Sequence, residues 1–347
     1  MVQNGDTVLI EAGIYQNDVA RWAASGLLIR GNGEFAHLKS GGNVYGGKAI
    51  WVIAGNDVTV ENIEFSEAAC VDRNGAGIRS EGINLTIRHC YFHDNEDGIL
   101  AGDISSGDII IEHCEFSRNG YVDGQAHNLY INHAHSLTFR YNYSHDAKVG
   151  HELKSRAFNN YIYYNRFSDE NGAASRSIDL PNGGFTILMG NLIVQDPLSE
   201  NSNLVGYGLE GLNNPNSELY AVYNTMVNNK SSGSFIQIAN GTPLLKIYNN
   251  IAAGPGAFLT GTPLILDTLS NLKAAVSAFG FSDPANYDYH PQEGSIVAGK
   301  AVNAGLAGAI PLTPDRAYVH PHDVEVRLLT EDAGAFALPA SSGVKAL

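Results

Sequence analysis

Three residues in the middle of the chain carry side chains that can transfer protons or bind ions, and they are evenly spaced. Tyr130, Lys154 and Asp179 are 24 and 25 residues apart, and each directly follows a leucine or an isoleucine. A phenol, an amine and a carboxylate can act as general acids, as general bases or as binding groups for a charged substrate. If the chain returns to the same place at this interval, the three side chains form one stripe.

Other polar residues lie close to these three in the sequence. Histidine titrates near neutral pH, and an arginine guanidinium can bind a carboxylate through two parallel hydrogen bonds. We therefore predict that the stripe and its neighbours bind a carbohydrate. The neighbours are His127, Asn128, His151, Glu152, Arg156, Arg176, Tyr207 and Glu210. In the alternative interpretation the stripe is a surface ladder of ion pairs, in which Lys154 pairs with Asp179. Arg156 would then pair with Glu152.

The even spacing reflects an internal repeat. A short pattern of alternating apolar and polar residues occurs eight times, and successive copies are 23 to 33 residues apart. The central position of the copies is Ile63, Cys90, Cys114, Asn142, Asn165, Asn191, Asn224 and Asn249. Such alternation indicates short strands, and no copy contains a capped helical pattern. The sequence therefore predicts an all-β chain: a single-domain right-handed parallel β-helix of about 8–10 coils.

The central position also predicts how the coils are held together. Asparagine side chains stacked on successive strands can hydrogen-bond along the axis at a spacing of about 4.8 Å. We assign these asparagines to the scaffold and expect Cys90 and Cys114, in the same position, to be buried thiols. The chain has three cysteines, which do not make a disulfide framework.

Composition limits the classes of partner and location. With 21 basic and 36 acidic residues the net charge is −15, which argues against nucleic-acid binding. No run approaches 18 apolar residues, so we expect no membrane partner. Residues 1–6 do not resemble a signal peptide, although a polymeric substrate favours a secreted or periplasmic location. We expect one monomeric domain over residues 1–347, with coils at 5–260 and a capping tail at 261–347 that contains a short helix at 268–279.

The alternation of side chains across a strand predicts which residues face outward. The predicted inward residues are Ile78, Ile99, Leu129, Leu153, Ile178, Leu209 and Ile236. The residue after each would face out, which places Glu210 on the stripe. Strict alternation would turn His127, His151, Arg176 and Tyr207 inward unless the strands bend.

In its repeats the chain resembles the β-helix proteins that include pectate lyases, polygalacturonases and the chondroitinase B/alginate lyase family. A narrower similarity to the last of these, polysaccharide lyase family six, lies in Lys154-Ser155, Asn160, Asn165-Arg-Phe167 and Arg176. The resemblance implies a lyase that cleaves an alginate-like polysaccharide. It also implies that Lys154 acts as the base and Arg176, 22 residues later, as the acid.

The chain departs from that family at the calcium ligands. The family has two glutamates shortly before the lysine, whereas this chain has only Glu152, so Ca²⁺ stays open as a cofactor. Five histidines between positions 127 and 151 lack the helical spacing of a zinc site, and we predict no zinc there. The residue patterns of polygalacturonases and pectate lyases are not found.

The residues fit β-elimination on a uronate, an acidic polysaccharide substrate. That reaction needs a group that neutralises the carboxylate, a base for the C5 proton and an acid for the leaving O4. Arg156 or Arg176 could neutralise the carboxylate, and Tyr130 or His151 could replace Lys154 in proton transfer. Two other functions remain open. One is a glycoside hydrolase that uses Asp179 and Glu210, and the other is a carbohydrate-binding β-helix without catalysis.

Overall fold

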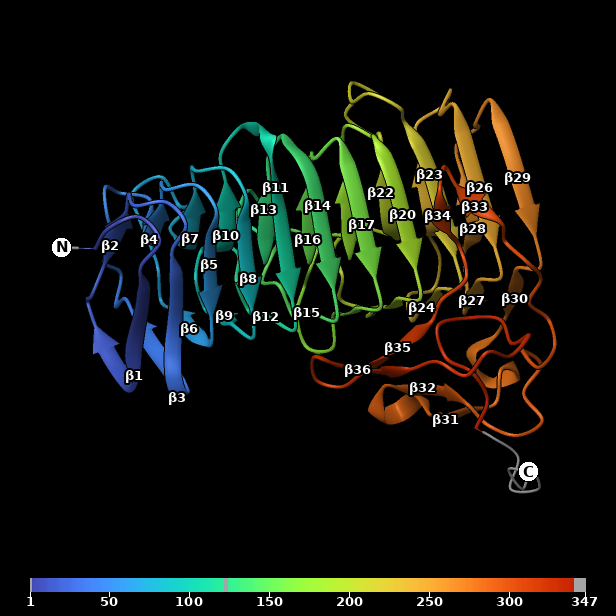
Figure 1. Ribbon diagram of the computed structural model, residues 1–347. Coiled ribbons are helices and arrows are strands. Elements are labelled where there is room, and N and C mark those ends of the chain that lie inside the picture. Colours follow the sequence, from blue (N-terminus) through green and yellow to red (C-terminus); the bar gives the residue numbers. More distant parts are fainter. Residues whose placement is uncertain (1, 122–123, 340–347) are drawn as a thin grey trace, which may run out of the picture.

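The computed structural model describes residues 2–121 and 124–339 of the chain. Short parallel strands stack along one axis into a long prism, with the N-terminus at one end (Figure 1). One side of the prism is a ten-stranded parallel sheet. Its strands are β2 (Ala20–Trp22), β4 (Ala49–Ile53), β7 (Ala76–Ser80), β10 (Asp97–Ala101), β13 (Leu129–Ile131), β16 (Leu153–Ser155), β19 (Ile178–Leu180), β22 (Asn203–Tyr207), β25 (Ser234–Ile238) and β28 (Ala257–Thr260).

The remaining strands of the prism form a 20-stranded sheet that folds around its other sides in two columns. The first column contains β1 (Thr7–Gln16), β3 (Leu28–Lys39), β5 (Val58–Glu61), β8 (Leu85–Arg88), β11 (Ile104–Glu112), β14 (Ala134–Arg140), β17 (Asn159–Tyr163), β20 (Phe185–Met189), β23 (Glu218–Val222), β26 (Leu244–Tyr248) and β29 (Ile265–Leu269). The second column contains β6 (Ile63–Ser66), β9 (Tyr91–His93), β12 (Glu115–Ser117), β15 (Tyr143–His145), β18 (Arg166–Ser168), β21 (Leu192–Gln195), β24 (Thr225–Asn228), β27 (Ile251–Ala253) and β30 (Leu272–Ala274). The ends of β1 and β3 begin this second column.

The predicted asparagine ladder is present at the corner between the two columns. The backbone N–H and the side-chain amide of Asn142 both donate to Oδ1 of Asn165, at 2.9 and 3.2 Å. Asn165 donates in the same way to Asn191, at 3.0 Å for both bonds. The ladder continues through Asn224, Asn250 and Asn271. The corner backbone of each coil is therefore hydrogen-bonded by a side chain of the next coil.

The first and last predicted positions of the ladder differ in outcome. Cys90 and Cys114 do occupy its first positions as buried free thiols, and Cys114 N–H donates to Oδ1 of Asn142 at 2.9 Å. The assignment of Asn249 to the ladder is wrong by one residue. Asn249 instead donates to the carbonyl of Val302 in the tail, at 2.7 Å, and Asn250 takes the ladder position.

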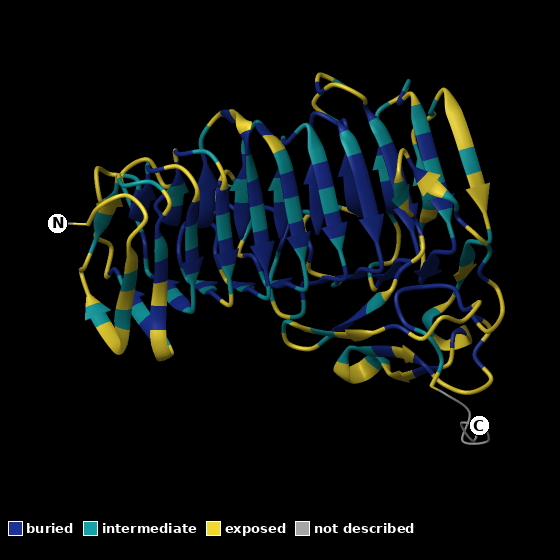
Figure 2. Cartoon of the chain, viewed as in Figure 1, coloured by how far each residue is buried: buried dark blue, intermediate teal, exposed yellow. Residues whose placement is uncertain are grey.

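The core inside the prism is built from stacked identical side chains. The rings of Phe65, Phe92 and Phe116 stack on successive coils with centroids 5.0 Å apart and interplanar angles below 10°. Buried residues continue along the prism between its first and last coils, whose strands β1 and β29 have no buried residue (Figure 2). In the next coil, Ser144 takes the phenylalanine position and leaves room for polar side chains in the core.

The register of the ten-stranded sheet follows the prediction except at one strand. Ile178 pairs with Val205, not with the predicted Leu209, and Asp179 pairs with Gly206. The strand ends at Tyr207 because Gly208 has a positive φ of 71°, which starts a turn. Glu210 therefore lies in this turn and not on the strand.

The tail begins later than predicted. The coils do not stop at residue 260, because β29 and β30 form a further coil through Ala274. The helix predicted at 268–279 is wrong. That segment contains the end of β29, all of β30 and the 3-10 turn η1 (Val276–Ala278).

After that coil the tail folds back along the later coils of both columns. It contains the 3-10 turn η2 (Pro284–Asn286) and the antiparallel pairs β31 (Phe281–Asp283) with β32 (Asp288–Pro291), β33 (Leu306–Ala307) with β34 (Ile310–Pro311), and β35 (Arg316–Val319) with β36 (Asp323–Val326). Phe279, Tyr289 and Phe336 of the tail pack on Leu192 and Ile251 of the later coils. The last eight residues of the predicted tail, 340–347, lie outside the described residues. No helix formed by the described residues has the length and apolar character needed to cross a membrane.

We predict that replacing one ladder asparagine destabilises the protein strongly. Asn165→Ala would leave the N–H groups of Asn142 without an acceptor and the carbonyl of Phe139 without the donor it now has at 2.8 Å. Unpaired buried groups of this kind cost about 2–4 kcal/mol in total. The measurement is the free energy of unfolding in urea. Asn171→Ala, at an exposed position, is the control. Equal losses in the two variants would contradict a supporting role for the ladder.

Candidate active site

The structure places Tyr130, Lys154 and Asp179 side by side on the ten-stranded sheet. They lie on β13, β16 and β19, and their Cα atoms are register partners from one coil to the next. The next position in the stripe is Gly206, where an added Cβ would lie 3.0 Å from Oδ1 of Asp179. The glycine therefore leaves the space that the Asp179 carboxylate occupies.

Lys154 lies between two carboxylates. Its Nζ is 3.9 Å from Oδ2 of Asp179 and 3.4 Å from Oε1 of Glu210. The ammonium group also lies 5.7 Å from the centre of the Tyr130 ring, on the preceding coil. Only 15% of the Lys154 side chain is exposed, so these pairs are shielded from solvent more than ordinary surface ion pairs are.

Arg156 binds three groups with its three nitrogen atoms. Nε donates to the Tyr130 hydroxyl at 2.9 Å, Nη1 donates to Oδ1 of Asn182, and Nη2 donates to Oε2 of Glu210 at 2.6 Å. The predicted alternative pair with Glu152 is therefore wrong. Burial lowers the pKa of Arg156, but the hydrogen bonds with Glu210 and Tyr130 outweigh it and raise that pKa above its usual value.

Glu210 reaches the site from its turn and covers both cations. Its two oxygen atoms are bound by Lys154 and Arg156, although its side chain is 49% exposed. Burial raises the pKa of Glu210, but the hydrogen bond and the charges of Arg156 and Lys154 bring it below the usual value. Lys154 and Arg156 thus form a binding pair for a carboxylate.

Asp179 is buried and receives contacts from three donors. Arg176 Nη1 lies 3.2 Å from Oδ1, and His151 Nε2 lies 3.4 Å from Oδ2, beside Lys154. Burial raises the pKa of Asp179, and the charges of Arg176 and Lys154 oppose that rise. Arg176 donates a hydrogen bond to Asp179, and Lys154 and His151 also turn donor atoms toward it, so these three neighbours favour the ionised carboxylate and offer no acceptor for a carboxylic proton.

His127 and His151 stack with ring centroids 4.9 Å apart and lie beneath the stripe. Nδ1 of His127 accepts the backbone N–H of His151 at 3.0 Å, and Nδ1 of His151 accepts that of Arg176 at 3.1 Å. Each ring therefore carries its proton on Nε2. Both histidines lie just before their strands, β13 and β16, and both are buried, so no bend exposes them. Gly150, directly before His151, has a φ of 111° and no space for a Cβ.

The electrostatics of this pair follow from its burial. Burial lowers the pKa of His127 to about 3, and the charges of Lys154 and Arg156 act in the same direction. Burial also lowers the pKa of His151 well below its usual value, assisted by His127 and Lys154. Both rings are therefore neutral hydrogen-bond donors near neutral pH, and the Nε2–H of His151 points to Asp179.

Three predicted substrate contacts lie inside the prism instead. Tyr207 is buried, as strict alternation required, and its hydroxyl donates to the carbonyl of Gly184 at 2.7 Å. Asn128 is buried and donates its amide hydrogen atoms to Glu152 and to Oγ of Ser144. None of these side chains can contact a polymer on the outer face.

Glu152 is the third of these buried residues. Its oxygen atoms accept from the backbone N–H of Ala147 at 3.0 Å and from Oγ of Ser144 at 3.1 Å. Burial raises the pKa of Glu152 well above its usual value, and the charge of Asp169 adds to the rise. Glu152 therefore cannot serve as the surface calcium ligand that the sequence left open.

Two residues of the site were missed in the sequence. Asn182 accepts from Arg156, and Asn203 accepts from Nε of Arg176 at 3.2 Å. Each asparagine lies one coil after the arginine that it binds, and it holds that arginine in place. Asn203 does not belong to the repeated pattern, and the only sequence signal for Asn182 is the Asn-Gly turn that it forms with Gly183.

Comparisons with known proteins agree with this architecture. Residues 12–174 match the family model described as "Right handed beta helix region". The fold is a right-handed parallel β-helix. The crystal structure of pectate lyase Pel9A matches with a TM-score of 0.64 and 13% sequence identity, over 97% of this chain and 89% of that chain. At this identity the likeness shows the fold alone.

The other comparisons add no information on chemistry. A Geobacillus virus E2 protein, ORF18, matches with a TM-score of 0.46 and 13% identity, over 78% of this chain and 54% of that chain, and carries no argument. No curated protein matches the chain. The narrower similarity to the chondroitinase B/alginate lyase family stays a prediction.

We predict that His127 makes the stability of the protein depend on pH. An unfolded histidine binds a proton near pH 6.5, whereas folded His127 binds one only near pH 3. Between these values the unfolded state holds more protons, so stability is full above about pH 6.5 and falls as the pH decreases. One such group contributes at most about 1.4 kcal/mol per pH unit. Urea unfolding of His127→Gln at a series of pH values should give a shallower slope than the unsubstituted protein gives. Parallel slopes would show that the pKa of His127 is the same in the folded and unfolded states.

Proposed function

We propose that the protein is a polysaccharide lyase that cleaves a uronate-containing, alginate-like polysaccharide by β-elimination. The observation that carries the proposal is the carboxylate-binding pair of Lys154 and Arg156, which holds the two oxygen atoms of Glu210. A uronate presents the same chemical group to the same face of the sheet. The fold, which it shares with pectate lyase Pel9A, is compatible with this chemistry but does not establish it.

The first requirement of the reaction is to neutralise the substrate carboxylate, which acidifies the adjacent C5–H bond. Lys154 and Arg156 can do this if the uronate takes the place of Glu210. The turn that carries Glu210 lies between Gly208 and Gly211, which have φ values of 71° and 120°. With an exposed side chain on this short turn, Glu210 can leave the two cations when a ligand competes for them.

The second requirement is a base, and the contacts favour Tyr130 over Lys154. Lys154 touches two carboxylates, an arrangement that suits an ammonium ion, and an ammonium ion cannot accept a proton. The Tyr130 hydroxyl is held by Arg156 at 2.9 Å, next to the carboxylate-binding pair. As the phenolate, Tyr130 would take the C5 proton.

The third requirement is an acid for the leaving oxygen. Tyr130 would return the same proton to O4 as the C4–O4 bond breaks and the C4–C5 double bond forms. Tyr130 then ends the reaction as the phenolate, as it began, and no proton is gained or lost. This route requires that the C5 proton and the leaving O4 lie on the same face of the sugar. Arginine keeps its proton in proteins, so Arg176 fits a binding role and not the role of acid. Asp179 positions Arg176, Lys154 and His151.

We predict that Tyr130→Phe abolishes turnover while binding survives. Loss of an acid–base group lowers kcat by about 100- to 10,000-fold, whereas KM should change little because Lys154 and Arg156 remain. The measurement is the ultraviolet absorbance of unsaturated uronate products over a panel of uronate polysaccharides, with and without EDTA. Lys246→Gln is the matched control, because this cation lies on β26 of the other sheet.

The outcomes separate the roles of the two residues. If Lys154→Arg were inactive and Tyr130→Phe active, Lys154 would be the base, as the family resemblance implies. Retention of the protein on polysaccharide gels with no product from any polymer would favour a binding module without catalysis.

A glycoside hydrolase remains the second candidate because of one observation. The pKa of Asp179 is raised and that of Glu210 is lowered, a separation that is typical of an acid and a base acting together. Against this, Asp179 has donors around it, and Glu210 has both oxygen atoms bound by cations. Neither carboxyl group is free to act on a water molecule or a leaving oxygen.

We predict that Glu210→Gln keeps or increases lyase activity. The amide binds Lys154 and Arg156 more weakly than the carboxylate does, so the substrate competes with less opposition and KM should fall several-fold. The measurement is kcat and KM with the polymer that gives activity, and Glu218→Gln on β23 is the control. A hydrolase built on Asp179 and Glu210 would instead lose activity in Glu210→Gln and would release new reducing ends without unsaturated products.

A further inference from the structure

We propose that His37, Glu64 and His93 form a binding site for a divalent transition-metal ion, and that zinc fits their donor atoms best. The three residues lie on β3, β6 and β9, in three successive coils of the second column. This is a different side of the prism from the candidate active site. The inference is independent of the proposed function.

The donor atoms of the three residues converge. Nδ1 of His37 lies 3.5 Å from Oε1 of Glu64, and Nε2 of His93 lies 2.9 Å from the same oxygen. All three donor atoms lie within 4.8 Å of one another. Ligands of a tetrahedral zinc ion, at bond lengths near 2.0–2.1 Å, are about 3.3 Å apart. Small side-chain rotations would therefore suffice to enclose the ion.

The second nitrogen of each ring is already committed to another group. Nδ1 of His93 is 2.8 Å from Oδ2 of Asp94, which can only accept, so that nitrogen carries a proton. Nε2 of His37 is 2.7 Å from Oγ of Ser66. A carboxylate behind a histidine is the usual outer-shell partner of a metal ligand, because it orients the ring and leaves the other nitrogen free to bind.

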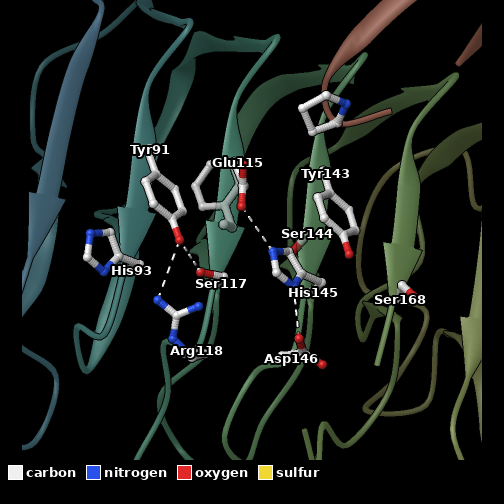
Figure 3. Close-up of polar contacts among 12 residues, drawn as sticks. Tyr91, His93, Glu115, Ser117, Arg118, Tyr143, Ser144, His145, Asp146 and Ser168 are labelled. Carbon is white, nitrogen blue, oxygen red and sulfur yellow. Dashed lines mark hydrogen bonds and ion pairs between the residues drawn. The ribbon is translucent and has the colours of Figure 1, made fainter. Parts of the chain in front are cut away.

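The same chain contains a matched arrangement that lacks one ligand. Two coils further on, Nε2 of His145 lies 3.2 Å from Oε1 of Glu115, and Nδ1 lies 2.9 Å from Oδ2 of Asp146 (Figure 3). The position before Glu115, which corresponds to His37, is Tyr91, whose hydroxyl contacts Ser117. This second unit therefore has one histidine for its glutamate, and the first unit has two.

This difference in ligand number determines the charge that each unit can hold. Burial lowers the pKa of His145, but the hydrogen bonds to Asp146 and Glu115 outweigh it and raise that pKa to about 9. A proton thus satisfies the second unit. In the first unit two rings face one carboxylate, with ring centroids 5.8 Å apart. The first unit therefore offers an ion three donor atoms, one more than the second unit offers.

The site is accessible from outside. The side chains of His37, Glu64 and His93 are 15–20% exposed. An open cavity of about 690 Å³ lies beside the first two of them, and its wall also includes Gly13 and Phe35. The described tail packs on later coils of this column and leaves the first coils uncovered (Figure 1). An ion bound to three protein ligands would keep a fourth position open to this cavity.

We expect one zinc ion to bind per chain with micromolar or tighter affinity. The full chain, treated with a chelator and dialysed, would be titrated with Zn²⁺ by calorimetry and with Co²⁺, whose visible absorption reports four-coordinate geometry. Zinc should also raise Tm by several degrees, because binding to the folded state stabilises it. Glu64→Gln and His37→Asn should each weaken binding at least about 10-fold, and Asp94→Asn about 10- to 100-fold.

Glu115→Gln and His145→Asn are the matched controls, because they alter the second unit in the same way. Both should bind zinc as the unsubstituted protein does. Circular dichroism would confirm that each variant is folded. If a ligand variant does not fold, Asp94→Asn still tests the proposal, because Asp94 contacts His93 without being a ligand itself. The proposal is overturned if no stoichiometric binding is found, or if Glu64→Gln and Glu115→Gln weaken binding equally.

Discussion

The structure depends on one repeated interaction, the hydrogen bond from the backbone and side chain of one corner asparagine to the side-chain oxygen of the next. The corner of each coil carries backbone groups that no strand can pair, and a buried unpaired group is costly. The ladder from Asn142 to Asn271 satisfies these groups from one coil to the next. Because each asparagine binds both neighbours, the coils keep one register, and every other column of side chains inherits it.

That register explains the unusual composition of the candidate active site. Parallel strands about 4.8 Å apart bring one side chain per coil into contact, whatever its charge. Tyr130, Lys154 and Asp179 therefore form a continuous row in which a cation separates a phenol from a carboxylate. Within the row, Asp179 is the one carboxylate, whereas Lys154 and Arg156 are two cations. Glu210 supplies the second carboxylate from a turn, and this is why a carboxylate from outside can compete for the place.

The sequence predicted the parts of the molecule that repeat and missed the parts that do not. The repeat period can be counted in the sequence. It predicts the fold, the ladder and the outward orientation of Tyr130, Lys154 and Asp179. Glu210 was predicted to lie on a strand because Leu209, directly before it, fits the pattern of an inward aliphatic residue. In the structure the strand ends at Tyr207, before Gly208, whose φ is positive. Asn128 and Glu152 could not be assigned to the core, because the gap that accepts them exists only where Ser144 replaces a phenylalanine.

The same reasoning explains why the fold does not determine the chemistry of this chain. The inward residues are constrained by stacking, so they must resemble their neighbours, while the outward residues of each coil are free to differ. A row of outward positions can therefore become a carboxylate-binding site on one side of the prism and a ligand cluster on another. His93 and His145 show how small the change is. They occupy the same column, two coils apart, with equivalent carboxylate partners. The residue one coil before the glutamate is His37 in one case and Tyr91 in the other, and it decides how many donor atoms the cluster offers to an ion.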